Sequence, residues 1–337
     1  MAETPAALPF RDPFGRTVRY VRLAVTDRCN LRCAYCMPEG YLGGEHPDDL
    51  LTFEELRTVA AAFVRLGVRK FRLTGGEPLV RKDLHVLVGY LSAFPEVRDL
   101  ALSTNGVLLR REAPRLAAAG LRRVNVSLDT LRPATFKRIS VNQSLDQVLD
   151  GIAAAEEAGL TPIKINCVVL RGINDDEVGE LARTTVTRGW TVRFIETMPM
   201  RQNPERQREL YVPAAEIRAR LEAEFGPLAE EPAEDIAGPA REVRIPGAAG
   251  KIGFITPLSH TFCAACNRVR VTPAGQLRLC LFGEAGADLR GPLRRGAGVD
   301  DVVALLQAAL ARKPESHRLA LGYGGPEAPI TMAQIGG

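Results

Sequence analysis

The feature that most constrains this chain is a run of three cysteines near the N-terminus, Cys29, Cys33 and Cys36, spaced as CxxxCxxC. Three thiolates on one tight loop can bind three irons of a cubane [4Fe–4S] cluster, and they leave the fourth iron open to a small ligand. The loop directly follows residues 19–25, whose alternating, β-rich pattern predicts a strand. Ligand sites of parallel α/β folds lie at the carboxyl ends of their strands, so the sequence predicts an iron–sulfur site at that edge.

Strand and helix patterns alternate along the chain as far as residue 196. A capping box, Thr52 followed three residues later by Glu55, predicts the start of the first helix. Strands are predicted at 19–25, 70–74, 99–103, 123–128, 162–169 and 191–196, and helices at 52–66, 82–94, 111–119, 145–158 and 176–188. This alternation implies a parallel sheet with helices packed outside it. Because a full barrel has about eight such units, we expect a partial, open (β/α)6 barrel.

The rest of the chain follows other patterns. Residues 1–18 are rich in proline and small or charged residues, which predicts a mobile arm, and residues 227–239 read as a linker or surface loop. Amphipathic helices are expected at 212–225 and 300–311. A chain of 337 residues has room for two domains. We therefore expect a partial barrel with its N-terminal arm over 1–235, and a C-terminal extension over 236–337.

A second cysteine group lies in that extension. Cys263 and Cys266 form a CxxC pair, and Cys280 follows after thirteen residues. The group suggests a second [4Fe–4S] cluster with an open iron; the alternative is a structural zinc with His260 as the fourth ligand. Arg268 and Arg270 favour the cluster, because a structural zinc has no use for two cations beside its ligands. Residues two apart on a strand face the same way, so both guanidinium groups can bind one phosphate.

Composition narrows the functional class. Seven cysteines, six of them in the two groups and one alone at Cys167, favour metal binding over disulfides in a chain with no signal-peptide pattern. No stretch approaches ~18 consecutive apolar residues, so we expect no membrane span and a cytoplasmic protein. The net charge of +4 and the 6% of aromatic residues disfavour a nucleic-acid-binding iron–sulfur or zinc module.

The cysteine triplet, together with Gly75-Gly76-Glu77-Pro78 after the second predicted strand, resembles the radical S-adenosylmethionine (SAM) superfamily. Motifs along nearly the whole chain resemble the GTP 3′,8-cyclase family within it. They are TDRCNLRCAYC at 26–36, STNG at 103–106, VSLDT at 126–130, KINCVV at 164–169, RFIETMP at 193–199, CNRVR at 266–270 and the terminal Gly-Gly pair. The resemblance implies a radical SAM barrel whose C-terminal extension carries an auxiliary iron–sulfur cluster.

The resemblance also implies a role for particular residues. The first cluster, on Cys29, Cys33 and Cys36, would bind SAM at its open iron, and the second, on Cys263, Cys266 and Cys280, would bind the guanine ring of GTP. The implied SAM contacts are Tyr35, Gly76, Ser127 and Met198. The implied GTP contacts are Arg22, Arg72, Thr104, Lys164, Arg268, Val269 and Arg270, with Lys70 and Arg193 nearby. Gly336 and Gly337 match a C-terminal tail that reaches into the active site and acts there in catalysis.

The implied reaction is the first step of molybdenum cofactor biosynthesis. A 5′-deoxyadenosyl radical from SAM would take the ribose H3′ of GTP, and the sugar radical would attack C8 of guanine to give (8S)-3′,8-cyclo-7,8-dihydroguanosine 5′-triphosphate. The family implies a reductant, a homodimer, and cyclic pyranopterin monophosphate synthase as the downstream partner. The alternative is another radical SAM enzyme with an auxiliary cluster, of the peptide-modifying type, although such enzymes usually carry more C-terminal cysteines.

Overall fold

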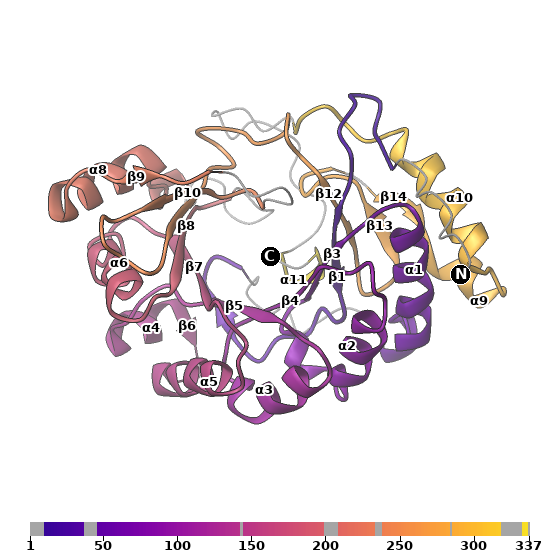
Figure 1. The fold of residues 1–337 in the computed structure, drawn as a ribbon, viewed down its shortest axis with the longest axis horizontal. Helices are drawn as coiled ribbons and strands as arrows, with labels where there is room; N and C mark the ends of the chain where they lie inside the picture. Colours follow the sequence, from indigo (N-terminus) through magenta and orange to yellow (C-terminus); the bar gives the residue numbers. More distant parts are fainter. Residues whose placement is uncertain are drawn as a thin grey trace.

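In a computed structural model, the chain forms one curved sheet with helices outside it (Figure 1). The structure describes residues 10–36, 46–141, 144–198, 208–232, 238–283, 285–317 and 332–335. Over these residues the sheet has twelve strands in the order β14-β13-β12-β1-β3-β4-β5-β7-β8-β11-β10-β9. The sheet is strongly curved, with strands of the C-terminal region at both of its ends (Figure 1).

The middle of this sheet is the predicted barrel. Its six neighbouring strands are all parallel, and they are β1 (Tyr20–Ala24), β3 (Lys70–Thr74), β4 (Asp99–Thr104), β5 (Arg123–Ser127), β7 (Lys164–Val169) and β8 (Thr191–Glu196). Each bound lies within two residues of the predicted one. The partial (β/α)6 fold is therefore confirmed, and the carboxyl ends of all six strands meet at one edge.

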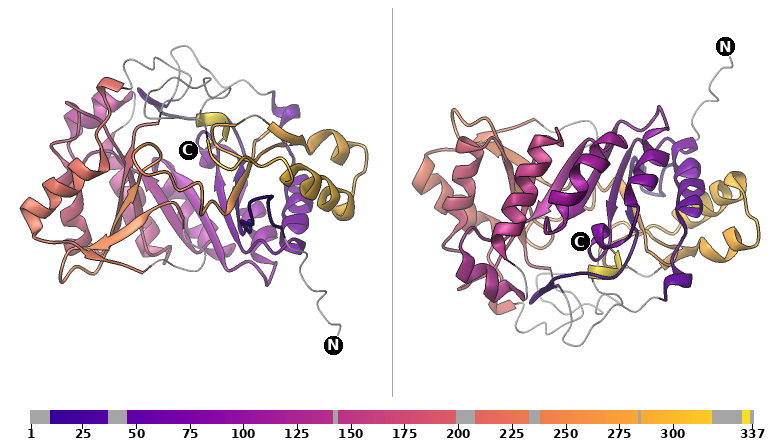
Figure 2. Two further views of the ribbon diagram at one scale, coloured as in Figure 1. Left: turned by 90° about the horizontal axis from the view of Figure 1, so that it is seen from above. Right: turned by 90° about the horizontal axis from the view of Figure 1, so that it is seen from below.

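Helices cover the outer face of these strands, as the view from below in Figure 2 shows. The helices of the barrel are α1 (Phe53–Arg65), α2 (Leu84–Ser92), α3 (Leu109–Ala118), α4 (Pro133–Ile139), α5 (Leu145–Glu157) and α6 (Val178–Thr187). The predicted capping box is present, because the Thr52 hydroxyl accepts from Glu55 N at 3.1 Å and the Glu55 carboxylate accepts from Thr52 N at 2.7 Å. Helix α4 was not predicted; its seven residues are too few for a clear periodic pattern.

The chain after β8 adds strands to both edges of the barrel. At one edge β12 (Arg268–Val271) runs parallel to β1, and β13 (Gln276–Arg278) and β14 (Ala285–Asp288) continue antiparallel. At the other edge β11 (Ile252–Ile255) runs parallel to β8, and β10 (Arg241–Arg244) and β9 (Ala229–Glu230) follow. The predicted linker 227–239 is thus wrong at β9, which pairs with β10. The remaining elements are β2 (Arg32–Cys33), β6 (Ser140–Val141), α8 (Ala214–Phe225), α9 (Arg290–Arg294), α10 (Val299–Leu310), α11 (Met332–Ile335) and two short 3-10 turns, Pro47–Asp49 and Pro78–Val80.

The prediction of a mobile arm is wrong for residues 10–18, while residues 1–9 lie outside the described ranges. Phe10 is only 1% exposed and packs edge-on against Phe63 of α1. The Arg16 guanidinium donates to the Asp12 carboxylate and, at 2.8 Å, to the Cys263 carbonyl oxygen. The arm is therefore part of the core and also supports the second cysteine group. Among the described residues, no helix combines the length and apolar character needed to cross a bilayer.

Candidate active site between the two cysteine groups

The first cysteine loop leaves the carboxyl end of β1 and runs along the backbone of the Gly75-Gly76 loop. Gly76 N donates to Thr26 O at 2.8 Å, and Glu77 N donates to Arg28 O at 2.8 Å. A Cβ on Gly76 would lie 2.4 Å from Arg28 O, a distance that no side chain tolerates. Glycine is required at position 76 because two backbones meet there, and this contact joins the predicted SAM-binding loop to the loop that carries the cysteines.

The three thiols of this loop lie close enough to influence one another. Burial raises the pKa of Cys29 to about 11 and that of Cys36 to about 12, and Cys33, whose pKa is also raised, feels the charges of both. Leu31 N donates to Cys29 Sγ at 3.4 Å, and Cys33 Sγ lies 3.4 Å from Ser140 Oγ. Bound iron would reverse the pKa shifts, since a coordinating thiol is deprotonated. Three clustered thiols with hydrogen-bond donors at sulfur fit a [4Fe–4S] cluster.

A buried carboxylate, Glu77, organises the strand ends behind this loop. It is 1% exposed and accepts from Leu79 N at 3.0 Å, Thr104 Oγ1 at 2.8 Å and Asn105 N at 2.6 Å. Burial raises the pKa of Glu77 to about 7, although these three donors oppose the shift. The Asn105 amide then donates to Asn30 Oδ1 at 2.8 Å and lies 3.8 Å from Cys29 Sγ. Thr104, a predicted GTP contact, therefore contacts Glu77 in this structure.

The other predicted SAM contacts lie along the carboxyl edge of the sheet. Tyr35 lies within the cysteine loop, and its hydroxyl donates to Asp129 Oδ2 at 2.7 Å. Ser127 is the exposed last residue of β5, whereas its neighbours Val126 and Leu128 are buried. Met198 follows β8 and packs against the apolar cluster around Ile335. With Gly76 after β3, four chain segments thus bring the predicted SAM residues to one edge.

The second cysteine group lies at the opposite end of the strands. Cys266 comes just before β12, whereas the first loop comes just after β1, and these two strands are parallel neighbours. Cys280 follows β13, which runs antiparallel to β12, so it returns to the same end as Cys266. Five residues of β1 at ~3.3 Å each place roughly 16 Å of strand between the two groups. That length can accommodate a nucleotide.

Lys313 and Arg16 hold the second group in place. The buried Lys313 ammonium donates to Arg268 O at 3.1 Å and to Leu279 O. Cys266 N donates to Cys263 O at 3.0 Å, which closes the CxxC turn. Burial opposes ionisation of Cys266, but the charges of Lys313 and Arg268 outweigh it and lower the pKa of this thiol. A thiolate held by a tight turn beside cations fits a ligand of a metal cluster.

A row of arginines crosses the sheet between the two cysteine groups. The strand register aligns Arg270 of β12 with Arg22 of β1, and Arg22 with Arg72 of β3. Each is at most 9% exposed, and burial together with repulsion from nearby guanidinium groups, including that of Arg268, lowers the pKa of all three, that of Arg72 to about 9. Arg278 of β13 aligns with Arg270 and extends the row. Sequence reasoning missed Arg278, because only the register of β13 reveals it.

The Tyr20 ring lies beneath this row. The Lys70 ammonium lies 5.3 Å from the ring centroid, and the guanidinium carbon of Arg72 lies 5.8 Å from it. Burial would raise the pKa of Tyr20, but Arg72, Arg22 and Lys70 together lower it to about 7. The lowered pKa of the phenol shows that the surrounding charge is strongly positive. Buried like charges of this kind favour an anionic ligand that carries several charges.

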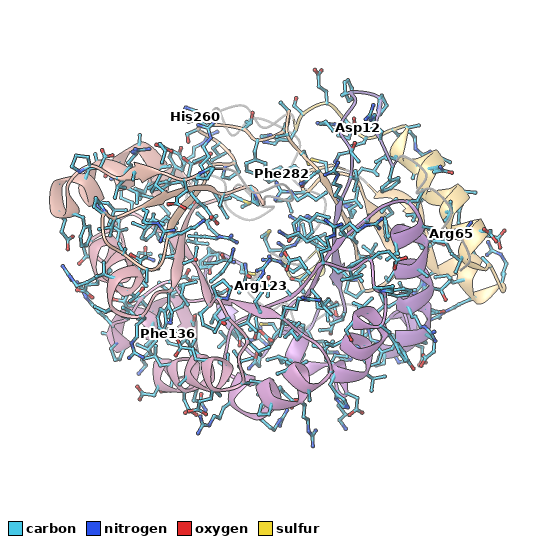
Figure 3. The ribbon with its side chains drawn as sticks, in the orientation of Figure 1. Asp12, Arg65, Arg123, Phe136, His260 and Phe282 are labelled. Carbon is cyan, nitrogen blue, oxygen red and sulfur yellow. The ribbon has the colours of Figure 1, made fainter. Side chains whose placement is uncertain are left out.

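The remaining predicted GTP contacts surround the same space. Lys70 forms an ion pair with Asp99 at 3.0 Å, and Arg193 forms one with Glu242 at 3.0 Å. Burial opposes ionisation of Glu242, but the charges of the buried Lys164, at the start of β7, and of Arg193 outweigh it and lower the pKa of this carboxyl. Figure 3 shows Arg123, another residue that sequence reasoning missed, inside the ring of strands. The side chain of Arg268 stacks on Phe262 at 4.7 Å, and Val269 is buried.

The C-terminal helix α11 lies inside the curve of the sheet (Figure 1). Ile335 is fully buried against Met198, Leu281 and Phe282, and its carbonyl oxygen accepts from Arg270 Nη1 at 3.4 Å. Gly336 and Gly337, the predicted catalytic tail, lie outside the described residues. The residue directly before them nevertheless joins a predicted SAM contact, Met198, to a predicted GTP contact, Arg270.

The structure also bears on the zinc alternative for the second cysteine group. Over the described residues, no group of three or more His, Cys, Asp and Glu side chains is arranged to hold a metal ion, and His260, the ligand of the zinc alternative, is exposed. A cubane cluster holds its thiolates farther apart than a single ion does.

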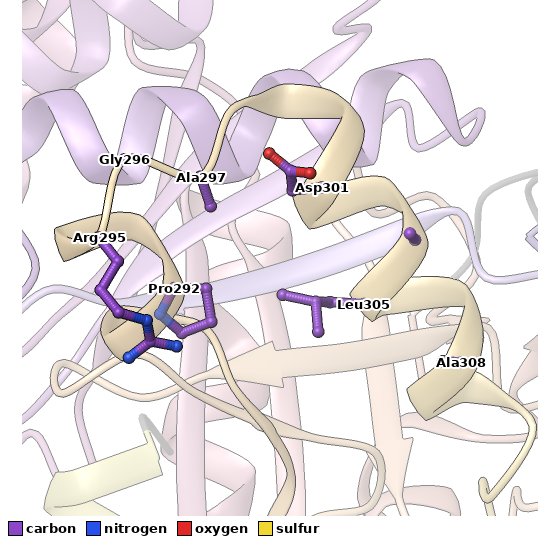
Figure 4. Close-up of a pocket in the computed structure, with 8 residues that line it drawn as sticks. Pro292, Arg295, Gly296, Ala297, Asp301, Leu305 and Ala308 are labelled. Atoms are coloured by element: carbon purple, nitrogen blue, oxygen red, sulfur yellow. The ribbon is translucent and has the colours of Figure 1, made fainter.

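A surface groove between α9 and α10 is lined by Pro292, Arg295 and Leu305 among others, and by none of the predicted site residues (Figure 4).

Comparison with solved structures matches this architecture. SuiB of Streptococcus suis bound to S-adenosylmethionine superposes with a TM-score of 0.59 at 13% identity, covering 86% of this chain and 72% of SuiB. SuiB bound to precursor peptide SuiA gives a TM-score of 0.59 at 14% identity, covering 88% and 71%. The family described as the Radical SAM superfamily matches residues 23–185, and Molybdenum Cofactor Synthesis C matches residues 190–319. Fold and site together define a radical SAM enzyme, whose domain takes a [4Fe–4S] cluster and SAM.

Curated relatives identify the family within that class. The GTP 3′,8-cyclase of Pelotomaculum thermopropionicum is 46% identical over 329 residues, which cover 97% of this chain and 100% of the relative. The GTP 3′,8-cyclase of Geobacter sulfurreducens is 47% identical over 333 residues, covering 97% and 99%. The chain belongs to the GTP 3′,8-cyclase family. The predicted resemblance is confirmed, and the peptide-modifying alternative is not favoured, because the likeness to SuiB extends to the fold alone.

Proposed function

We propose that this protein converts GTP into (8S)-3′,8-cyclo-7,8-dihydroguanosine 5′-triphosphate, the first step of molybdenum cofactor biosynthesis. The names of its full-length relatives support this assignment. The observation that carries it is the row formed by Arg270, Arg22 and Arg72, which lies between a cysteine loop at one end of the strands and a second cysteine group at the other. A triphosphate would place negative charge beside these buried guanidinium groups, and a purine nucleotide suits the roughly 16 Å of strand between the two cysteine groups.

Cys29, Cys33 and Cys36 would hold the first [4Fe–4S] cluster, and Tyr35, Gly76, Ser127 and Met198 would surround SAM. The cluster and SAM together would supply the radical chemistry that the proposed reaction needs at the ribose C3′ position. The protein would position SAM next to GTP and exclude water from the space between them. Gly76 fixes the backbone of the SAM loop, and Met198 packs on Ile335 of the C-terminal helix.

Cys263, Cys266 and Cys280 would hold a second [4Fe–4S] cluster, whose open iron would take the guanine ring. Arg268 and Arg270, with Arg22 and Arg72, would bind the triphosphate, and Thr104, Lys164, Val269, Lys70 and Arg193 would lie near the nucleotide. In this proposal, residues 1–235 bind the first cluster and SAM, and residues 236–337 bind the second cluster and the guanine ring. Both regions contribute cations that bind the triphosphate. Gly336 and Gly337 would extend the tail from Ile335 toward the reacting ribose.

The cellular setting is also proposed from the family. The reaction needs an external reductant, and its product would pass to cyclic pyranopterin monophosphate synthase. We propose a cytoplasmic homodimer that engages neither membrane nor nucleic acid. Sedimentation of the anaerobic protein would measure the oligomeric state directly, and a monomer at working concentration would exclude the dimer.

The decisive experiment combines metal analysis with turnover. Anaerobically purified protein should contain about eight irons and eight sulfides per chain if both cysteine groups carry a cubane cluster. Incubation with SAM, GTP and dithionite should release 5′-deoxyadenosine and the cyclised nucleotide in equal amounts. About four irons would exclude the second cluster. SAM cleavage that ignores GTP but responds to another nucleotide would assign a different substrate.

Replacing both Arg268 and Arg270 with alanine should weaken GTP binding by about a hundredfold, because the substrate loses a charge-assisted hydrogen bond from each guanidinium group. Equilibrium dialysis of GTP measures this loss. Iron content should stay at the wild-type value, since neither side chain is a cluster ligand. The exposed Arg241 of β10 is a matched control, and R241A should bind GTP normally. Loss of half the iron in the double variant would mean that the arginines support the cluster instead.

A further inference from the structure

Asp129 is a buried acid that the proposed function does not use. It follows β5 by two residues, is 6% exposed, and uses both carboxylate oxygens. Oδ2 accepts from the Tyr35 hydroxyl at 2.7 Å, and Oδ1 accepts from Val168 N of β7 at 2.8 Å. A buried carboxylate with two donors is well satisfied. One of those donors belongs to the cysteine loop, which lies 94 residues earlier in the chain.

The backbone of Asp129 is held as firmly as its side chain. Its carbonyl oxygen accepts from the Asn174 amide at 2.7 Å. The same amide also donates to Val168 O at 3.0 Å, and Asn174 Oδ1 accepts from Leu170 N at 2.7 Å. Asp129 is thus fixed to β7, a strand of the sheet, and to the turn that follows it. A group held in this way can impose a position on a more mobile partner.

The cysteine loop needs such support at its second half. Its first half is held by the Gly76 backbone contact and by the Asn105 amide near Cys29. Its second half contacts the end of α4 and the strand that follows: β2 pairs with the two-residue strand β6, Ala34 N donates to Ile139 O at 3.0 Å, and Cys33 Sγ lies 3.4 Å from Ser140 Oγ. Tyr35 lies directly before Cys36, so a bond at the end of its ring constrains both that ring and the adjacent thiol.

We propose that Asp129 is a positioning residue for SAM: through the hydroxyl of Tyr35 it holds the aromatic ring against the SAM site, in line with Ser127 two residues before it. This inference rests on the proposed function, because it assigns the ring to SAM. It also explains why a tyrosine, rather than a phenylalanine, serves this chain at position 35. A purely structural role for Asp129 would affect folding and iron content instead of SAM affinity.

The test uses reconstituted, full-length protein and three variants: Y35F, D129A and the double variant. Y35F keeps the ring and loses only the hydrogen bond, so it should weaken SAM binding about tenfold while leaving iron content unchanged. D129A should weaken SAM binding at least as much, and the double variant should bind SAM no more weakly than D129A alone. D129N should regain part of the affinity, since an amide can donate to the phenol oxygen.

Three readouts keep the interpretation clear. SAM affinity from equilibrium dialysis and the SAM-induced change in the electron paramagnetic resonance spectrum report the position of the ring. The KM for SAM should rise while the KM for GTP stays constant. E156Q is the matched control. Glu156 lies on α5, where its carboxylate accepts a hydrogen bond from the Trp190 indole at 2.7 Å, and Trp190 is not a predicted site residue.

Several results would overturn the proposal. Wild-type SAM affinity in Y35F would do so, and so would additive losses in the double variant, because uncoupled residues do not act through one bond. If D129A does not fold, Y35F and D129N still decide the outcome. Wild-type protein that fails to bind SAM at all would instead exclude the proposed function, so the two failures are distinguishable.

Discussion

Alanine at position 76 should remove the first cluster and stop the reaction. The added Cβ would lie 2.4 Å from Arg28 O and 2.7 Å from Asp27 O, and both atoms belong to the backbone that leads into Cys29. The two loops must therefore separate, which displaces the first cluster ligand. A misplacement of about 1 Å near reacting groups costs on the order of a hundredfold in rate. We expect G76A to lose roughly half its iron and at least about 99% of its GTP-dependent 5′-deoxyadenosine.

The chain supplies a matched control for this variant. A Cβ on Gly89, in the middle of α2, would meet nothing within 4 Å. G89A should therefore stabilise the protein by about 0.5–1 kcal/mol, because alanine is the better helix former, and leave turnover unchanged. Iron analysis, 5′-deoxyadenosine release and a urea titration of both variants would check these expectations. If G76A keeps its full iron content and its activity, the contact between the two loops is not what fixes the cluster.

Replacing Asp99 with asparagine should lower the free energy of unfolding by several times as much as replacing an exposed carboxylate. Asp99 forms ion pairs with Lys70 at 3.0 Å and with Arg123 at 2.6 Å, and all three side chains are largely buried. The substitution leaves two buried cations without their counter-charge, which costs about 3–5 kcal/mol. The free energy of unfolding from anaerobic urea titrations at pH 7 measures this loss. D48N, which changes a 90% exposed carboxylate, should shift it by less than about 0.5 kcal/mol.

The pH dependence of this effect has a definite sign. Burial opposes ionisation of Asp99, but Arg123 and Lys70 outweigh it and hold the pKa of this carboxyl well below its usual range. A carboxyl with a depressed pKa in the folded state contributes stability above its unfolded pKa of about 3.9, and loses it as the pH falls further. The stability gap between wild type and D99N should thus be constant from about pH 5 to 8 and narrow below about pH 4. A gap that widens in acid would contradict the ion-pair account.

Much of the fold followed from local sequence patterns. The six parallel strands and most helices were predictable because apolar periodicity and the box at Thr52 and Glu55 are properties of neighbouring residues. The two cysteine groups were visible for the same reason, since ligand spacing is written in the chain. The C-terminal strands β11 and β12 were not assigned to opposite edges of the barrel, because strand order depends on long-range pairing that periodicity does not encode.

The site was predictable only where a motif or a family resemblance reached it. Glu77 and Asn105 act through contacts to other loops, and Arg16 and Lys313 support the second cysteine group from distant segments. Arg278 belongs to the cationic row only through the register of β13 with β12. Glu77 and Asn105 lie within recognisable motifs, but neither motif indicates that the two residues are hydrogen-bonded to each other. Arg16, Lys313 and Arg278 carry no local signal of their roles. Their assignment needed the three-dimensional arrangement, in which side chains from distant parts of the sequence meet.

The pairing of β1 with β12 has a consequence for the order of assembly during synthesis. These strands are neighbours in the sheet, yet Arg22 and its partner Arg270 are far apart in the sequence. Until β12 emerges from the ribosome, β1 is an unprotected edge strand, and such edges invite pairing with other chains. Contacts of such long sequence separation also slow folding. A nascent chain can therefore form its first cysteine loop well before its cationic row, so nucleotide binding reports that the sheet has been completed.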